Sequence, residues 1–157
     1  MPPLTGAPVR VDVVRGLRDR RGAVHAGSFL RERRIALDCT RAEFPRILVH
    51  EVAHFIWLRL GNPARWSYED VVRAEIAAGA RGELGWSAER GKHALRAEHI
   101  AGRTRRWREY GCESFCDTAA WLYSGVDRHE EFTMGARWRR RRQIWFAEVL
   151  ENRTLSI

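Results

Sequence analysis

Apolar and polar residues alternate near the N-terminus and take a helical period further along the chain. Residues 8–14 (PVRVDVV) alternate in this way, which predicts a half-buried strand. After a turn at RDRRG (18–22), residues 23–39 read as a hairpin. Its second arm, RRIALDC (33–39), directs three side chains to one face: Ile35, Leu37 and Cys39. The pattern predicts a small antiparallel sheet at the N-terminal side.

A long helix is predicted to follow this sheet. It begins at the capping-box pattern of Thr40 and Glu43, or one turn later with Pro45 in its first turn, and Gly61 ends it. Residues 47–58 (ILVHEVAHFIWL) lie in its interior. They are apolar on every side of the helix, which indicates burial all round, except at three positions: His50, Glu51 and His54.

The rest of the chain is predicted to be mostly helical. The remaining helices are expected at about 67–79, 88–100, 112–123 and 134–150, with a polar, glycine-bearing loop at 79–92. Neither an internal repeat nor a linker divides the sequence. Its 157 residues are therefore expected to form one domain, 1–157, of the α+β class.

The polar residues inside the long helix have the spacing of a metal site. Residues four apart on a helix share a face, with Cβ atoms about 5–6 Å apart, so His50 and His54 converge while Glu51 stands beside His50. HEVAH fits the pattern His-Glu-x-x-His, in which the imidazoles bind Zn²⁺ and the glutamate takes a proton from the metal-bound water. A core helix with histidines bonded to carbonyls explains one histidine, but not two together with a carboxylate.

A catalytic zinc has three protein ligands and one open position, so a third ligand must come from another segment. Glu113 and Asp117 are also four residues apart, in a stretch whose other positions are largely apolar. Two carboxylates that face a core need a cation. Glu113 is therefore the best candidate for the third ligand.

With these residues the chain resembles the gluzincin metallopeptidases, the zincin group that contains thermolysin. In that group a second helix presents Glu-x-x-x-Asp to the His-Glu-x-x-His helix, and residues 113–117 (ESFCD) match this motif. The resemblance covers roughly residues 23–125. The small size of the chain is similar to that of the minimal gluzincins and the ImmA/IrrE-like domains.

This resemblance implies a zincin-like fold, with the sheet packed on a mostly helical bundle, and a zinc-dependent metallopeptidase activity. His50, His54 and Glu113 would bind the zinc, and Glu51 would be the general base. Asp117 would orient a ligand histidine through its second nitrogen. A catalytically inactive zincin-like scaffold would keep the same ligands, so it remains an alternative.

The resemblance also predicts where a peptide or protein substrate binds. In the compact families a short strand precedes the metal helix, and its exposed edge binds the extended peptide. RRIALDC (33–39) stands in the matching place, so we expect a cleft between this edge and the metal helix. The sequence leaves the substrate's own residues and the oligomeric state open.

One departure from the family pattern leaves rivals for the third ligand. Between His54 and Glu113 lie 58 residues, more than in a compact gluzincin, so residues 61–110 would be an inserted helical segment. Glu75 lies at a more usual distance, but Gly79 occupies the place where an aspartate should follow. The other rivals have polar surroundings that need no metal: His93, Glu98, His99 and Glu109.

Three cysteines, Cys39, Cys112 and Cys116, are too few and too odd in number for a disulfide framework. Cys112 and Cys116 have helical spacing and offer an alternative pair of metal ligands. They are directed about 100° around the helix from Glu113 and Asp117, however. We expect all three to be buried thiols.

Other polar residues are candidates for smaller roles. Residues 129–133 (HEEFT) are a near miss for the metal motif, and we expect a solvated approach to a helix that borders the cleft. A tetrahedral oxyanion needs a hydrogen-bond donor. Spacing does not choose among five candidates for it: His93, His99, Tyr110, Tyr123 and His129.

The net charge of +8 comes almost wholly from arginine, because Lys92 is the only lysine, and it suggests an anionic partner. Arginine is mixed with tryptophan or glutamate in residues 31–34 (RERR), 103–108 (RTRRWR) and 137–142 (RWRRRR). Such stretches favour a second hypothesis, an arginine-rich nucleic-acid-binding protein. The simplest interpretation is a solvated, arginine-biased surface.

The N-terminal residues lack the continuous apolar segment of a secretory signal. No run approaches the roughly 18 apolar residues of a membrane span. We therefore expect a soluble, cytoplasmic protein without a membrane partner.

Overall fold

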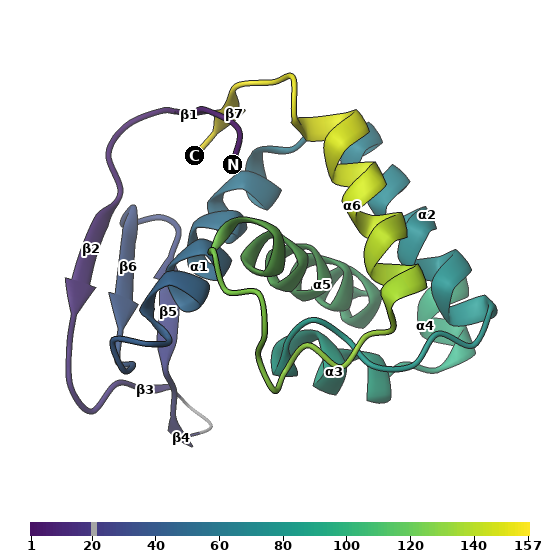
Figure 1. The fold of residues 1–157 in the computed structure, drawn as a ribbon, viewed down its shortest axis with the longest axis horizontal. Helices are drawn as coiled ribbons and strands as arrows, with labels where there is room; N and C mark the ends of the chain where they lie inside the picture. Colours follow the sequence, from purple (N-terminus) through teal and green to yellow (C-terminus); the bar gives the residue numbers. More distant parts are fainter. Residues whose placement is uncertain (20–21) are drawn as a thin grey trace.

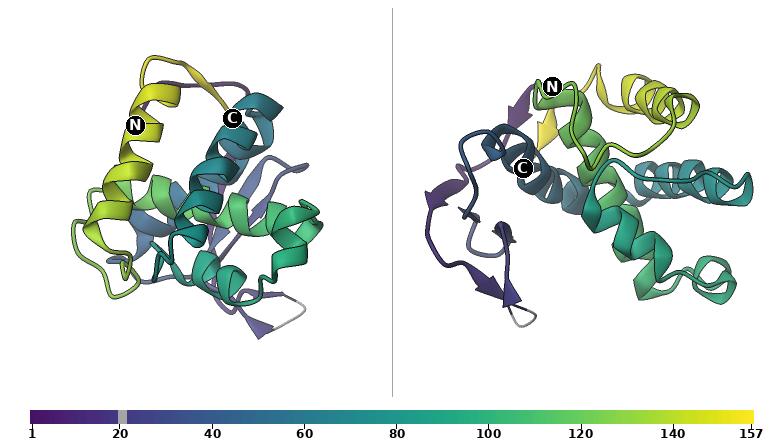
Figure 2. Two further views of the ribbon diagram at one scale, coloured as in Figure 1. Left: turned by 90° about the vertical axis from the view of Figure 1, so that its right-hand side faces the viewer. Right: turned by 60° about the horizontal axis from the view of Figure 1, so that its bottom comes forward.

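The chain folds into a small sheet and a set of helices, and helix α1 lies between the two (Figure 1). The computed structural model describes residues 1–19 and 22–157. Short strands come first and helices follow, so these residues form an α+β structure, as the sequence predicts. In the right-hand view of Figure 2, the strands β2 to β6 lie at one end and helices α2 and α6 at the other.

The three-stranded sheet has the order β2-β6-β5. Strands β5 (Ala26–Phe29) and β6 (Arg34–Leu37) are antiparallel, with Ala26 opposite Leu37, which confirms the hairpin. Strand β2 (Arg10–Val13) is parallel to β6, so the prediction of a wholly antiparallel sheet is wrong. The apolar strand β6 takes the centre because its Ile35, Ala36 and Leu37 are all fully buried, which an edge position does not allow.

The edge strands differ from the sequence predictions as well. RRIALDC is the central strand and not an edge, and β5 is the edge strand that packs against α1. Strand β2 lies at the other edge. The strand predicted within residues 8–14 is confirmed as β2, but its half-buried pattern is wrong, because Val11 and Val13 are 41% and 72% exposed. Helix α1 packs mainly on β5 and β6, which leaves the valines of β2 uncovered.

Two pairs of very short strands complete the β structure. Strands β3 (Arg18–Asp19) and β4 (Gly22–Ala23) are antiparallel, and the centre of the predicted RDRRG turn, residues 20 and 21, lies outside the described residues. Strand β1 (Leu4–Thr5) is parallel to β7 (Leu155–Ser156). The two ends of the chain therefore lie side by side near α1 (Figure 1).

Helix α1 (Phe44–Arg59) begins after Glu43 and has Pro45 in its first turn, as one of the two predicted starts requires. The alternative start with Thr40 as the cap is wrong. Glu43 makes no capping hydrogen bond, because its carboxylate pairs with Arg46 and His129 instead.

The other helices are α2 (Asn62–Ala77), α3 (Trp86–His93), α4 (Ala97–Ala101), α5 (Arg105–Tyr123) and α6 (Ala136–Leu150). Helix α2 begins before the predicted Ser67 because Pro63 already occupies its first turn. The helix predicted at 88–100 is two helices, and α5 is longer than predicted. Among the helices of the described residues, none has the length and apolar character needed to cross a membrane.

Aromatic rings fill the core between α1, α2, α5 and α6. Phe115 of α5 stacks on Phe146 of α6 with ring centroids 5.0 Å apart. Tyr68 of α2 packs edge-on against Phe115, with centroids 5.6 Å apart, and Trp57 of α1 and Trp145 of α6 border the same group. These contacts fix the position of α5, because one of its faces is surrounded by the three other helices.

Side chains of the arginine-rich stretches are used inside the fold. Arg33 donates a hydrogen bond to a backbone carbonyl, and Arg103 pairs with the Glu69 carboxylate. In α6, Arg139 donates to backbone carbonyl groups and Arg142 is fully buried. These four guanidinium groups have partners within the chain, whereas other arginines of the same stretches are exposed. The nucleic-acid-binding hypothesis therefore stays a prediction.

Arg142 is the centre of a buried ionic cluster. Its Nε and Nη2 atoms donate to Glu75 at 3.0 and 2.8 Å, and its Nη1 donates to Glu83 at 2.8 Å. Burial would raise the pKa of Glu83, but Arg142 beside it lowers that pKa below its ordinary value. The cluster ties α6 to α2 and to the segment that leads into α3.

We predict that Arg142→Ala lowers the free energy of unfolding by about 3–5 kcal/mol, because it leaves the buried Glu75 carboxylate without its cation and Glu83 with Lys92 alone. Unfolding in urea, followed by circular dichroism, measures this change. Arg141→Ala is the matched control, because Arg141 is the next residue and is exposed. Its effect should stay within about 0.5 kcal/mol. Equal losses in the two variants would contradict the structural role of Arg142.

Candidate metal centre

Helices α1 and α5 pack against each other and carry the predicted metal ligands where they meet. His50 and His54 lie one turn apart on α1, and their Nε2 atoms are 3.2 Å apart. From α5, one Glu113 carboxylate oxygen lies 3.5 Å from Nε2 of His50, and the other lies 4.0 Å from Nε2 of His54. The structure thus brings together the three residues that the sequence singles out.

The spacing of these donors fits a single zinc ion. Zinc bonds of about 2.0–2.2 Å to nitrogen and oxygen, in tetrahedral geometry, place two ligand atoms roughly 3.3–3.6 Å apart. The separations of 3.2, 3.5 and 4.0 Å between the two rings and the carboxylate lie around this range. Only the last is long, and a small rotation of the Glu113 side chain shortens it.

Asp117 fixes the ring of His50 from the opposite side. Its Oδ1 lies 2.8 Å from Nδ1 of His50, and its Oδ2 accepts a hydrogen bond of 3.0 Å from the backbone N–H of Ala88 in α3. Because a carboxylate only accepts, Nδ1 carries a proton and Nε2 is directed toward Glu113. This contact is the one that the sequence analysis expects of Asp117.

Gly85 makes room for the Asp117 carboxylate. A Cβ atom at position 85 would overlap the carboxyl group of Asp117, so a larger residue there would displace it. Asp117 is only 2% exposed, since the backbone from Gly85 to Ala88 closes directly over it. This segment is predicted as a loop from the sequence, and its role is not predictable there, because no local pattern relates a glycine to a distant carboxylate.

The charges of the site shift the pKa values of its members. Burial alone would lower the pKa of His50, but the Asp117 carboxylate raises it well above its ordinary value. Burial would raise the pKa of Glu113, but its hydrogen bond with His50 and the charge of His54 lower it. Positive charge is therefore favoured between these side chains, and a divalent cation is one group that could supply it.

Glu51, the expected general base, is buried beside His50 and is held by the edge strand of the sheet. Ser28 of β5 donates a hydrogen bond of 2.6 Å to Oε2 of Glu51, and its hydroxyl also lies 2.9 Å from the backbone carbonyl of Glu51. Ser28 is not predictable as a site residue, because a serine in a short strand does not by itself indicate a contact with a distant carboxylate. The contact places the edge of β5 next to the metal helix.

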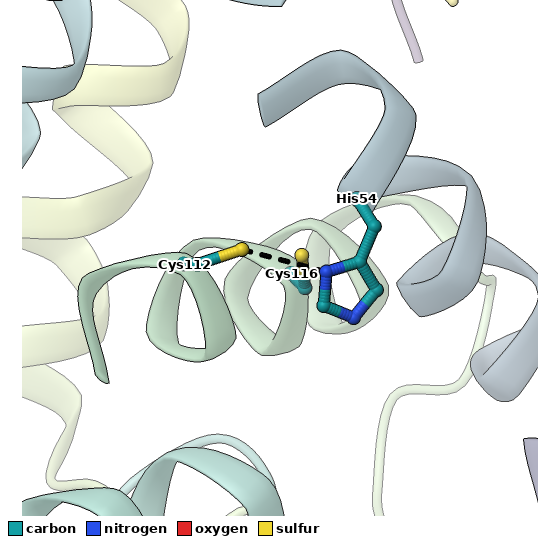
Figure 3. Close-up of side chains that lie close together, drawn as sticks. All are labelled: His54, Cys112 and Cys116. Atoms are coloured by element: carbon teal, nitrogen blue, oxygen red, sulfur yellow. Dashed lines mark hydrogen bonds between the residues drawn. The ribbon is translucent and has the colours of Figure 1, made fainter. Parts of the chain in front are cut away.

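The second nitrogen of His54 faces a thiol pair. Nδ1 of His54 lies 3.4 Å from Sγ of Cys112, and Cys116 follows one turn later on α5 (Figure 3). The hydrogen bond with Cys116 lowers the pKa of Cys112 to about 6, although burial opposes this shift. Cys116 is buried, as predicted, whereas the prediction of a buried thiol is wrong for Cys39 and Cys112, which are half-buried. Cys112 also contacts a predicted ligand.

The rival third ligands have other partners. The Glu75 carboxylate pairs with Arg142 in the buried cluster, and Glu109 pairs with Arg105 at the surface. His99 accepts the backbone N–H of Arg96 at the start of α4. Within the part of the chain that the structure describes, the grouped ligand atoms include none of the histidine and glutamate rivals. Glu113 therefore remains the best candidate.

Residues 129–133 lie beside the first turn of α1. Nε2 of His129 lies 3.0 Å from a Glu43 oxygen, and Arg46 bridges the Glu43 and Glu131 carboxylates at 2.7 Å each. The sequence analysis expects this segment to border the cleft as a solvated approach. Glu131 is buried, however, and its carboxylate also accepts a hydrogen bond from the backbone N–H of Trp86. The prediction of a solvated segment is therefore wrong at Glu131.

The structure narrows the choice of an oxyanion donor only in part. The Tyr110 hydroxyl donates to the buried Glu83 carboxylate at 2.7 Å, so it is engaged elsewhere.

Between α3 and α5 lies an open pocket of about 540 Å³ whose wall includes Glu113. Arg90, in the same wall, is near enough to lower the pKa of Glu113.

We predict that Gly85→Ala weakens zinc binding by about 10- to 100-fold, because the added methyl group displaces the carboxylate that holds His50. Asp117→Ala should have the same effect without crowding. Titration against a zinc chelator of known affinity measures it. Gly91→Ala, in the neighbouring helix α3, is the control, because its Cβ would make only an ordinary contact of 3.5 Å with Tyr110. An unchanged affinity in Asp117→Ala would argue against this positioning role.

Comparisons of the chain with protein-family models, with curated proteins and with solved structures give no match. The resemblance to the gluzincins therefore depends on the motif residues themselves. Its structural support is the arrangement of His50, His54, Glu113 and Asp117 between α1 and α5.

Proposed function

We propose that this protein is a zinc-dependent metallopeptidase with a zincin-like fold of the gluzincin type. One observation carries the proposal: the Nε2 atoms of His50 and His54 and the Glu113 carboxylate converge between two buried helices at ligand spacing. Three neighbouring electron-rich groups of this kind, with one side open, are the donor set of a catalytic zinc and not of a closed structural one.

His50, His54 and Glu113 would hold the ion, and Asp117 would keep the His50 ring in place. When bound, Zn²⁺ supplies Lewis acidity, which lowers the pKa of a ligand water from 15.7 toward about 7 and polarises a carbonyl group. The half-buried positions of His54 and Glu113 leave a side of the site open toward solvent and toward the pocket that Glu113 borders.

Glu51 would move the proton. Its carboxylate follows His50 directly in the chain, is 7% exposed, and adds to the negative charge that His50 senses. It would accept a proton from the attacking water and pass it to the leaving amine of the peptide. The hydrogen bond from Ser28 holds the Glu51 carboxylate toward the sheet edge, so this side chain is already fixed in one conformation before a substrate binds.

Strand β5 supports a peptide as the substrate. Among the described residues it pairs with β6 on one side only, so its other edge has backbone groups with no described strand beside them. Ser28 lies on this edge strand and contacts Glu51, which brings the edge within reach of the general base. An extended peptide that adds to β5 as a further strand would place its backbone next to the metal ligands.

Metal content and hydrolysis together test this proposal. We predict that His50→Ala and Glu113→Ala each bind one zinc equivalent per chain less than the wild type, because a three-ligand site does not survive the loss of a ligand. Glu51→Gln should keep its zinc and lose hydrolysis of unfolded casein by about 10²- to 10⁴-fold. Elemental analysis and a fluorescent casein assay measure the two quantities.

Glu148→Ala serves as the control, because Glu148 is exposed on α6 and, among the described residues, belongs to none of the grouped ligand sets. It should keep both zinc and activity. A wild-type protein that binds zinc but hydrolyses no peptide would favour the inactive scaffold. A Glu113→Ala variant with full zinc content would refute the ligand set.

A further inference from the structure

We propose that Cys112, Cys116 and Nδ1 of His54 form a second metal site, selective for a thiophilic ion such as Cu(I). This site lies across the His54 ring from His50 and Glu113. It shares only His54 with the proposed zinc site and does not depend on peptidase activity. Figure 3 shows the two thiols of α5 and the ring of α1 directed toward one another.

The geometry is already close to that of a bound ion. The candidate ligand atoms of the three residues all lie within 4.8 Å of one another, and Sγ of Cys112 is 3.4 Å from Nδ1 of His54. Metal bonds of about 2.3 Å to sulfur and 2.0–2.1 Å to nitrogen place two donors roughly 3.5–4 Å apart. Small rotations of the cysteine side chains are enough to bring all three onto one ion.

The three donors lie in a largely buried site that is accessible to solvent on one side. Cys116 is fully buried in the helix packing, whereas Cys112 and His54 are half-buried and give access from the surface. Two facing helices hold the three donors, so the site is preorganised by the same contact that forms the zinc site. A pair of thiols packed only against apolar groups would not have an imidazole nitrogen within hydrogen-bond distance.

The donor set selects the ion. Two thiolates are soft ligands that favour Cu(I) over hard ions such as Mg²⁺ or Ca²⁺, and imidazole also suits copper. Binding would release the two thiol protons to solvent and leave the ion with two thiolates and one neutral imidazole. Glu113 and His50, by contrast, offer oxygen and nitrogen, which suit zinc.

The two sites share His54, and this couples them. A neutral imidazole has one nitrogen with a free lone pair. When Nδ1 binds Cu(I), the proton resides on Nε2, and that nitrogen no longer serves the site with His50 and Glu113. Cu(I) would therefore weaken zinc binding by roughly tenfold or more, and zinc would weaken Cu(I) binding equally. This part of the inference alone depends on the proposed zinc site.

The test is an anaerobic titration of the reduced, metal-free, full-length protein with Cu(I) in competition with a chromophoric Cu(I) chelator. We expect one equivalent to bind with the ultraviolet charge-transfer band of a copper thiolate. Cys112→Ser and Cys116→Ser should lose this band and at least about 100-fold in affinity. Cys39→Ser, the matched control, and Glu113→Gln should retain both.

A second measurement needs no variant. Cu(I) should protect Cys112 of the wild type from alkylation by iodoacetamide, read by mass spectrometry, while the half-buried Cys39 stays reactive. Full Cu(I) binding in a folded Cys112→Ser variant would overturn the second site, as would equal protection of Cys39. Loss of Cu(I) in Glu113→Gln would assign the ion to the other site. Copper binding without any effect on zinc would leave the second site standing and refute the coupling.

Discussion

The packing of α1 against α5 is the constraint on which the rest of this structure depends. It places two imidazoles, a carboxylate and two thiols within a few ångströms of one another in a largely buried contact. Polar groups of this kind are costly in a core unless charge or hydrogen bonds compensate them. The raised pKa of His50 and the lowered pKa of Glu113 are two expressions of the same demand for positive charge.

The surrounding elements hold this contact in place. The aromatic cluster of Phe115, Tyr68 and Phe146 buries the opposite face of α5 against α2 and α6. Arg142 anchors the segment before α3 through Glu83, and this segment in turn closes over Asp117. A continuous chain of buried contacts therefore leads from the last helix to the ring of His50. Metal ligands need such support, since small displacements of a ligand weaken binding.

The Nδ1 atoms of His50 and His54 have different partners. His50 has a carboxylate behind it, which fixes its tautomer firmly, whereas His54 has a thiol. Sulfur is a weaker and more adaptable partner than a carboxylate, and it is also a metal ligand in its own right. One imidazole therefore stands between oxygen and nitrogen donors on one side and sulfur donors on the other.

The sequence by itself determined what a short, local pattern can specify. Pro45 and the apolar residues of 47–58 specify a buried helix, and its period puts His50 and His54 on one face. The same period pairs Glu113 with Asp117, so spacing and burial single out these four residues, while the role expected of Asp117 comes from the resemblance to the gluzincins.

Only the tertiary structure decided how these faces meet. The parallel pairing of β2 with β6, the edge position of β5, and the contacts of Ser28 with Glu51 and Gly85 with Asp117 all join residues far apart in the chain. The crossing of α1 and α5 also turned Cys112 toward His54, although its position around the helix is about 100° from Glu113. Spacing fixes directions within one helix, but a site between two helices also depends on how they pack.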